Sequence, residues 1–144
     1  MHRSYGGGRE KGDGFGVNVN QRLEQALSDL VKGDIWPLSR PPDEKGDEYI
    51  VYNPELETPE EFGDDEDLEW TQYMQVHWFK KGTGRTRAVN CTEARKKIRK
   101  RLRENGFSVS EIRTFFEKDT GFTHLCVSCN TLEEVENDND AGTR

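Results

Sequence analysis

The sequence predicts an α+β domain, in which a small, mostly antiparallel sheet of about four strands carries two helices packed on one face. Three features of the pattern predict this class. Two segments, 19–31 and 94–102, space their apolar residues three and four apart, as amphipathic helices do. A long segment between them, Glu69–Lys80, alternates with the period of two that a strand requires. A last pair of alternating segments flanks a short turn and predicts a hairpin.

The bulk composition predicts that only part of the chain packs into this domain. The 144 residues are 31% hydrophobic and 34% charged, which is poor in apolar side chains for a compact globule. We therefore expect a flexible glycine-rich arm over residues 1–18 and a single domain over residues 19–130. Residues 131–144 are acidic and lack periodicity, so we expect a disordered tail there.

The first helix of the domain is predicted by five apolar residues on one face. They are Leu23, Ala26, Leu27, Leu30 and Val31. Gly33 is expected to end this helix. The next apolar phrase, DIWPL, is broken by Pro37, so we expect a short extended piece at a sheet edge or a packing clip.

A short strand follows at Tyr49–Asn53 (YIVYN), and Pro54 is expected to stop it. The segment after it, Glu55–Glu69, holds nine acidic residues and no basic one. Like charges at this density repel, so we expect a mobile acidic loop over residues 55–69 that joins two antiparallel strands. The loop is either solvated or a projection that meets a basic surface.

The long strand Glu69–Lys80 is expected to lie at the centre of the sheet. One of its faces carries Trp70, Met74, Val76 and Trp78, and is the more apolar of the two. We therefore assign that face to the core.

A basic helix follows this strand. Asn90 and Glu93 have the spacing of a capping box, and Gly106 is placed as a C-terminal glycine. The apolar stripe of this helix consists of Ala94, Ile98 and Leu102. Its cations are Arg95, Lys96, Lys97, Arg99, Lys100, Arg101 and Arg103.

The cations have three possible roles: a solvated outer face, a phosphate-backbone contact, or a contact with an acidic surface of a neighbouring subunit. The net charge of −7 disfavours nucleic acid or an anionic membrane as the partner of the whole surface. Opposite charges occur in separate blocks of the chain, which favours the subunit contact. The candidate interaction residues are Arg95, Lys96, Arg99, Lys100 and Arg103 in one block and Asp64, Asp65, Glu66 and Asp67 in the other.

The final hairpin is predicted from strands Phe107–Glu117 and Phe122–Asn130, with Asp119 and Gly121 in the turn. The alternation slips near Ser110, which indicates a bulge.

No catalytic constellation is found, so we expect a protein that is not an enzyme and binds no metal or cofactor. Cys126 and Cys129 form a C-x-x-C, but residues three apart on a strand point to opposite faces and cannot share a metal. His77 and His124 lie mid-strand, where satisfied or surface sheet histidines are expected. No segment is apolar enough to span a bilayer and no signal peptide is recognised, so an intracellular location is expected.

The phrases VNQRLEQALSDL, DIWPL, EYIVYN, YMQVHWF, TEARKKIRKRL and EKDTGFTHLCV follow one another over residues 19–130. In this order they resemble the tail terminator or tail completion proteins of long-tailed bacteriophages. The acidic segment 55–69 and the glycine-rich arm depart from that pattern.

The resemblance implies an α+β structural protein without catalytic residues. Such proteins form a ring, usually hexameric, that caps the major tail tube protein and meets the head connector proteins. DNA passes through the ring without sequence-specific binding. The expected location is the virion, at the head–tail interface of the tail, and the host cytoplasm during assembly. Two alternatives stay open: another head–tail connector or neck component, and a small nucleic-acid-binding regulator that uses the basic helix 95–103.

Overall fold

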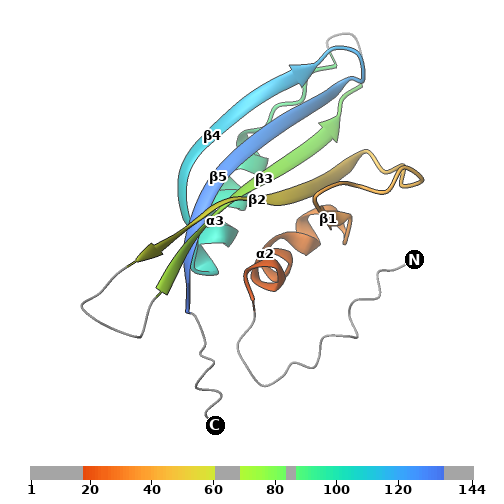
Figure 1. Ribbon diagram of the computed structural model, residues 1–144. Helices are drawn as coiled ribbons and strands as arrows, with labels where there is room; N and C mark the ends of the chain where they lie inside the picture. Colours follow the sequence, from red (N-terminus) through yellow and green to blue (C-terminus); the bar gives the residue numbers. More distant parts are fainter. Residues whose placement is uncertain (1–17, 61–68, 84–86, 135–144) are drawn as a thin grey trace.

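The computed structural model describes residues 18–60, 69–83 and 87–134 (Figure 1). In chain order the elements are α2 (Val19–Leu27), the 3-10 helix η2 (Ser28–Val31), β1 (Ile35–Pro37), β2 (Glu48–Glu60), β3 (Glu69–Lys81), α3 (Thr92–Glu104), β4 (Ser108–Glu117) and β5 (Phe122–Glu134). The predictions for the arm up to residue 17, the acidic residues 61–68 and the tail from residue 135 concern residues outside this description.

The strands form one sheet in the order β1-β2-β3-β5-β4, so β3 lies at its centre as predicted. β1 runs parallel to β2, and the other neighbouring pairs are antiparallel. The predicted α+β class is confirmed, with five strands rather than about four. The DIWPL phrase supplies the additional strand, β1, at the sheet edge.

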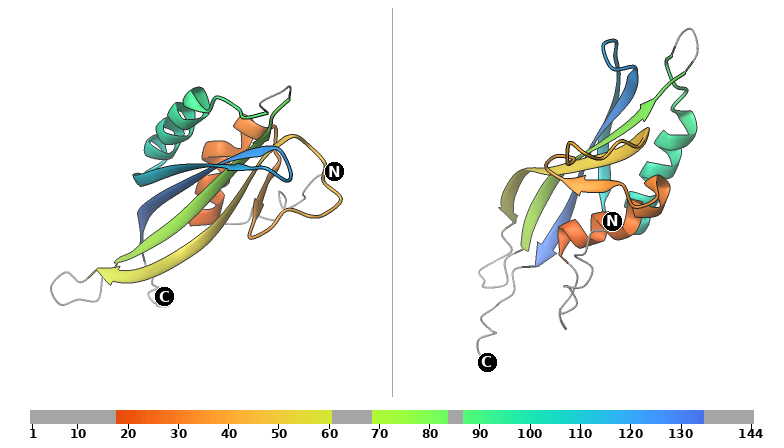
Figure 2. Two further views of the ribbon diagram at one scale, coloured as in Figure 1. Left: turned by 90° about the horizontal axis from the view of Figure 1, so that it is seen from above. Right: turned by 90° about the vertical axis from the view of Figure 1, so that its right-hand side faces the viewer.

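Both helices pack on the same face of the sheet (Figure 2). Between helices and sheet lies one core, to which α2 contributes Leu23 and Leu27, and α3 contributes Ile98 and Leu102. The core face of β3 is the predicted one. Its Met74, Val76 and Trp78 are all buried.

The first helix begins with a capping box that the sequence analysis missed. The Asn18 side chain accepts a hydrogen bond from the Gln21 backbone N–H at 2.8 Å, and the Gln21 side chain accepts one from the Asn18 N–H at 3.1 Å. The helix tightens into η2 and then ends at two left-handed residues, Lys32 (φ 54°) and Gly33 (φ 85°). Gly33 therefore marks the end of the helix, as predicted.

β2 continues past Pro54, so the prediction that this proline ends the strand is wrong. The pairing with β3 shifts register between Pro54 and Leu56, which makes Glu55 the extra residue of a bulge. β1 pairs only with Ile50 to Tyr52, so beyond that point no strand of the described chain lies on the outer side of β2. Proline lacks a backbone N–H, and at the edge of a sheet no neighbouring strand requires that donor. The prediction of a loop is therefore wrong for residues 55–60, which belong to β2.

α3 begins differently from the prediction and ends as predicted. Asn90 Oδ1 accepts a hydrogen bond from the backbone N–H of Thr92, two residues on, rather than from Glu93. The predicted capping box is therefore replaced by an Asx-turn just before the helix. At the other end, Gly106 has a φ of 88°, and the backbone N–H of Phe107 donates to the Leu102 carbonyl at 3.0 Å. This is the glycine-terminated Schellman arrangement.

The last two strands form the predicted hairpin, and their register shifts between Val109 and Glu111, where the bulge was expected. β5 runs on to Glu134, so the assignment of residues 131–134 to a disordered tail is wrong. The cause is a polar junction at the end of the strand. The Thr131 hydroxyl donates to the carbonyl of Gly106 at 2.8 Å, and Arg22 donates to Thr131 Oγ1 at 3.1 Å.

Candidate interaction surfaces

The rotation of α3 about its axis is fixed by contacts on both flanks. On the side of α2, Arg101 donates to Asp29 Oδ1 at 2.5 Å. This bond lowers the pKa of the Asp29 carboxyl. On the other side, Arg95 Nη2 lies 3.5 Å from Thr114 Oγ1 of β4. These two contacts therefore fix the directions in which the other cations of α3 point.

Three cations of α3 line up on the flank that faces β4. Residues four apart on a helix lie close to one line, so the row that begins at the anchored Arg95 continues with later residues. We call Arg95, Arg99 and Arg103 the arginine row. Arg99 and Arg103 are exposed, and no described residue pairs with either. Lys96 and Lys100 are exposed on the outer face of the helix beside this row, and Lys100 pairs with Glu104 at 3.4 Å.

The acidic half of the predicted interaction site cannot be placed. Asp64, Asp65, Glu66 and Asp67 all lie outside the described residues. The described part of the same acidic segment is the end of β2, where Glu55 and Glu57 are exposed.

The sheet face opposite the helices carries a cluster of aromatic and histidine side chains, which the sequence analysis did not predict. Its members are Tyr49, His77, Phe79, Phe115, Phe122 and His124. Tyr49 and Phe79 stack with their ring centroids 4.6 Å apart, and Phe79 and His124 stack at 4.3 Å. Both contacts follow from the register, since Phe79 lies opposite both partners. No helix in the described residues covers this open face (Figure 2).

Two histidines meet within this cluster. His77 Nδ1 lies 2.9 Å from His124 Nε2, while the other ring nitrogen of His77 lies 3.2 Å from Asn53 Oδ1. His124 Nδ1 lies 3.6 Å from a Glu117 carboxylate oxygen. Burial lowers the pKa of both rings; proximity to His124 lowers that of His77 further, and Glu117 opposes the shift at His124. The pair therefore favours the neutral state at neutral pH.

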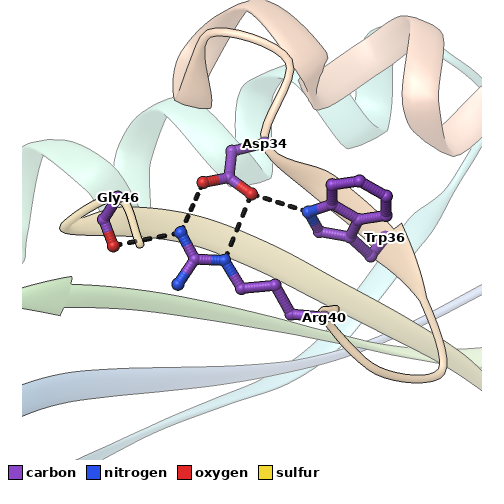
Figure 3. Close-up of polar contacts among 4 residues, drawn as sticks. All are labelled: Asp34, Trp36, Arg40 and Gly46. Carbon is purple, nitrogen blue, oxygen red and sulfur yellow. Dashed lines mark hydrogen bonds and ion pairs between the residues drawn. The ribbon is translucent and has the colours of Figure 1, made fainter. Parts of the chain in front are cut away.

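An ion pair between Arg40 and Asp34 fixes the loop after β1 (Figure 3). Asp34 accepts hydrogen bonds from Arg40 Nη2 at 2.6 Å and from the Trp36 indole N–H at 2.6 Å. Arg40 also donates to the Gly46 carbonyl at 3.0 Å. The Arg40 guanidinium lies 3.8 Å from the centroid of Tyr49 and extends the aromatic stack.

The two edges of the sheet differ in their chemistry. β4 has no strand on its outer side within the described chain, and it exposes 46% of Phe115 and 40% of Phe116. At the other edge, beyond its contact with β1, β2 exposes 54% of Leu56 between Glu55 and Glu57. One edge is therefore aromatic and lies beside cations, and the other is acidic with one exposed leucine.

The cysteines lie as the alternation predicted. Cys129 is buried in the core, whereas Cys126 is half-buried on the open face. Burial raises the pKa of Cys129 to about 12. Within the described ranges, no three His, Cys, Asp or Glu side chains are grouped so that they could hold a metal ion. No helix of those ranges is long and apolar enough to cross a membrane.

The sequence matches no protein-family model and no curated protein. Among solved structures, the fold is similar to a chain of the "Virion of native gene transfer agent (GTA) particle", with a TM-score of 0.54 and 9% sequence identity. The similarity covers 81% of this chain and 95% of that chain. At this identity the comparison establishes a shared fold.

Proposed function

We propose that this protein is a structural component of a virion that caps the tail tube as a ring and joins the tail to the head. The observation that carries the proposal is the fold shared with a chain of the gene transfer agent virion, across nearly the whole of that chain. A fold by itself does not determine function. The resemblance of the ordered sequence phrases to tail terminators of long-tailed bacteriophages supports the same class of protein.

The surfaces of the molecule suit this role. A ring of identical subunits needs two different, complementary surfaces on each subunit. The arginine row and the acidic end of β2 lie on different parts of this chain and carry opposite charge. The proposed partners are further copies of the chain in a hexameric ring, the major tail tube protein and the head connector proteins. The chain acts as an assembly component rather than as an enzyme.

The net charge of −7 also suits a channel for DNA. A negatively charged lumen repels the phosphate backbone, so DNA can slide through the ring without being held.

Deletion of the gene tests this function in particles. The proposal predicts full heads that are separate from tails, and tails that exceed their normal length because nothing stops the tube. Tails of normal length that fail to join heads would instead favour another connector or neck component. Intact, infectious particles without the protein would contradict both roles.

The exposed arginine row also supports a second candidate, a small regulator that binds nucleic acid. Filter binding of duplex DNA against salt concentration separates the two. A regulator that contacts phosphates through α3 loses affinity steeply as salt rises. The tail role predicts weak binding to duplex DNA at every salt concentration, and the same weak binding by Arg99→Glu.

A further inference from the structure

We propose that neighbouring copies of this chain join edge to edge, with the end of β2 from one copy lying along β4 of the next. This inference rests on the proposed ring function and specifies its subunit interface. The occupant of the β4 edge is a second copy of this chain, and its contacting segment is Glu55–Thr58.

The sheet topology permits this contact to repeat around a ring. β2 and β4 lie on opposite sides of β3 in the strand order, so the contact uses two different surfaces of each copy. Such heterologous contacts close into rings when the rotation between copies is suitable. Both edges also present backbone N–H and C=O groups that no described strand pairs on the outer side, and a further strand can bond to them.

The apolar side chains of the two edges match on the open face of the sheet. Residues that lie opposite each other on adjacent strands share a face. Leu56 lies opposite Tyr73, and Phe115 lies opposite His124, on the same face as Phe79. When the sheets continue from copy to copy, the exposed Leu56 can therefore pack against the exposed Phe115. Their contact would remove apolar surface from water on both copies.

The charges match on the helix face. Glu57 lies opposite Gln72, which is buried on the core side, so Glu57 points to the face that carries the helices. The arginine row flanks β4 on that same face, since Arg95 contacts Thr114. Edge pairing would place the exposed Glu57 beside exposed guanidinium groups that have no partner within the described residues. Such complementarity fixes the register and direction of association.

The prolines of β2 limit which strands can pair with this edge. Pro54 and Pro59 cannot donate hydrogen bonds and bracket the segment Glu55–Thr58. Only a short stretch can therefore form backbone hydrogen bonds with another chain. Selection of the partner then depends on Leu56 and the acidic side chains, because prolines and charges at an edge oppose indiscriminate pairing.

Charge reversal on each edge tests the interface by sedimentation equilibrium of the purified full chain. The double variant Arg95→Glu/Arg99→Glu is expected to self-associate at least roughly tenfold more weakly than the unmodified chain, and so is Glu55→Lys/Glu57→Lys. A chain with all four substitutions is expected to recover self-association, because each edge again meets the opposite charge. Lys97→Glu/Lys100→Glu makes the same change in charge outside the arginine row and is expected to leave self-association within roughly twofold.

Two results together are decisive. Misfolding does not produce recovery in the four-fold variant, and a general charge effect does not weaken Glu55→Lys/Glu57→Lys, because that variant carries less net negative charge than the unmodified chain. Urea unfolding midpoints verify that each variant is folded. The inference is overturned if the β2 or arginine-row variants associate as the unmodified chain does, if recovery fails, or if the unmodified chain is monomeric at low salt. Tube capping is measured separately. If the chain caps tubes but its self-association is insensitive to these charge reversals, the proposed interface is contradicted and the proposed function is not.

Discussion

His77 and His124 are in contact at the centre of the open face, and their burial gives the fold a dependence on pH. Both have a pKa below the ordinary value of 6.5. Well above pH 6.5 the rings are neutral in folded and unfolded chains alike, so their contribution to stability is fully present. As pH falls through 6.5, the unfolded chain takes up protons before the folded chain does, and the folded state loses stability.

We therefore predict that the free energy of unfolding falls between about pH 7.5 and about pH 5.5. Urea titrations at several pH values measure this change. The variant His77→Gln/His124→Gln removes both rings and is expected to flatten the profile over this window. An equally steep fall in the variant would mean that other groups are responsible.

Gly106 determines how α3 ends. It has a φ of 88°, and a Cβ at this position would lie 2.9 Å from Arg22 Nη1. Gly106→Ala is expected to lower the free energy of unfolding by about 1–2 kcal/mol, because alanine is strained in the left-handed region. Urea denaturation measures the loss. Gly33→Ala is a matched control, since Gly33 has a similar φ but no atom within 4 Å of the added Cβ. Equal losses of stability in the two variants would mean that the close approach to Arg22 contributes nothing to the loss at Gly106.

At the scale of elements, the cations of α3 look alike in the sequence but differ in the structure. Arg101 donates to Asp29 and to the Ala26 carbonyl, and so joins α3 to α2. The side chain of Arg103 has no partner among the described residues. We predict that Arg101→Ala lowers the midpoint of urea unfolding, whereas Arg103→Ala leaves it nearly unchanged. The reverse order would contradict the assignment of α3's flanks.

The elements also differ in how well the sequence predicts them. The core face of β3 and the stripe of α3 could be predicted because each depends on periodicity within one segment. The contact between His77 and His124 could not, because it depends on the register between β3 and β5, which neither strand contains alone. The sequence shows that positions 79, 122 and 124 are aromatic or histidine. It does not show that they lie close together.

Two errors at strand ends have tertiary causes. Pro54 is a strand breaker in the centre of a sheet, but here it occupies a bulge at an edge. Thr131 reads as the start of an acidic tail, but its hydroxyl bonds to α3's terminal Gly106 and to Arg22 of α2. Neither contact can be inferred from the composition of the local segment. The arginine row, by contrast, lay within the predicted interaction residues, and the structure added which flank each cation occupies.

At the scale of the whole molecule, the described residues present an acidic edge, an aromatic edge beside arginines, and an open face that none of their helices covers. This arrangement suits a subunit that is completed by neighbours rather than by a ligand. A disulfide between copies should report the proposed contact. A chain that carries Leu56→Cys and Phe115→Cys, with Cys126→Ser, is expected to form covalent ladders on oxidation. Chains with either new cysteine alone should give at most dimers, and ladders from them would contradict the pairing.

The most direct test of the central claim is the length of tail tubes assembled from purified tail tube protein and viewed by electron microscopy. With the unmodified chain present, we predict short tubes that carry a ring of this protein at one end. With Arg95→Glu/Arg99→Glu the tubes should grow as if nothing had been added, and the four-fold charge reversal should restore the cap. Tubes that grow to full length with the unmodified chain, or that bear it along their sides rather than at an end, would contradict the account.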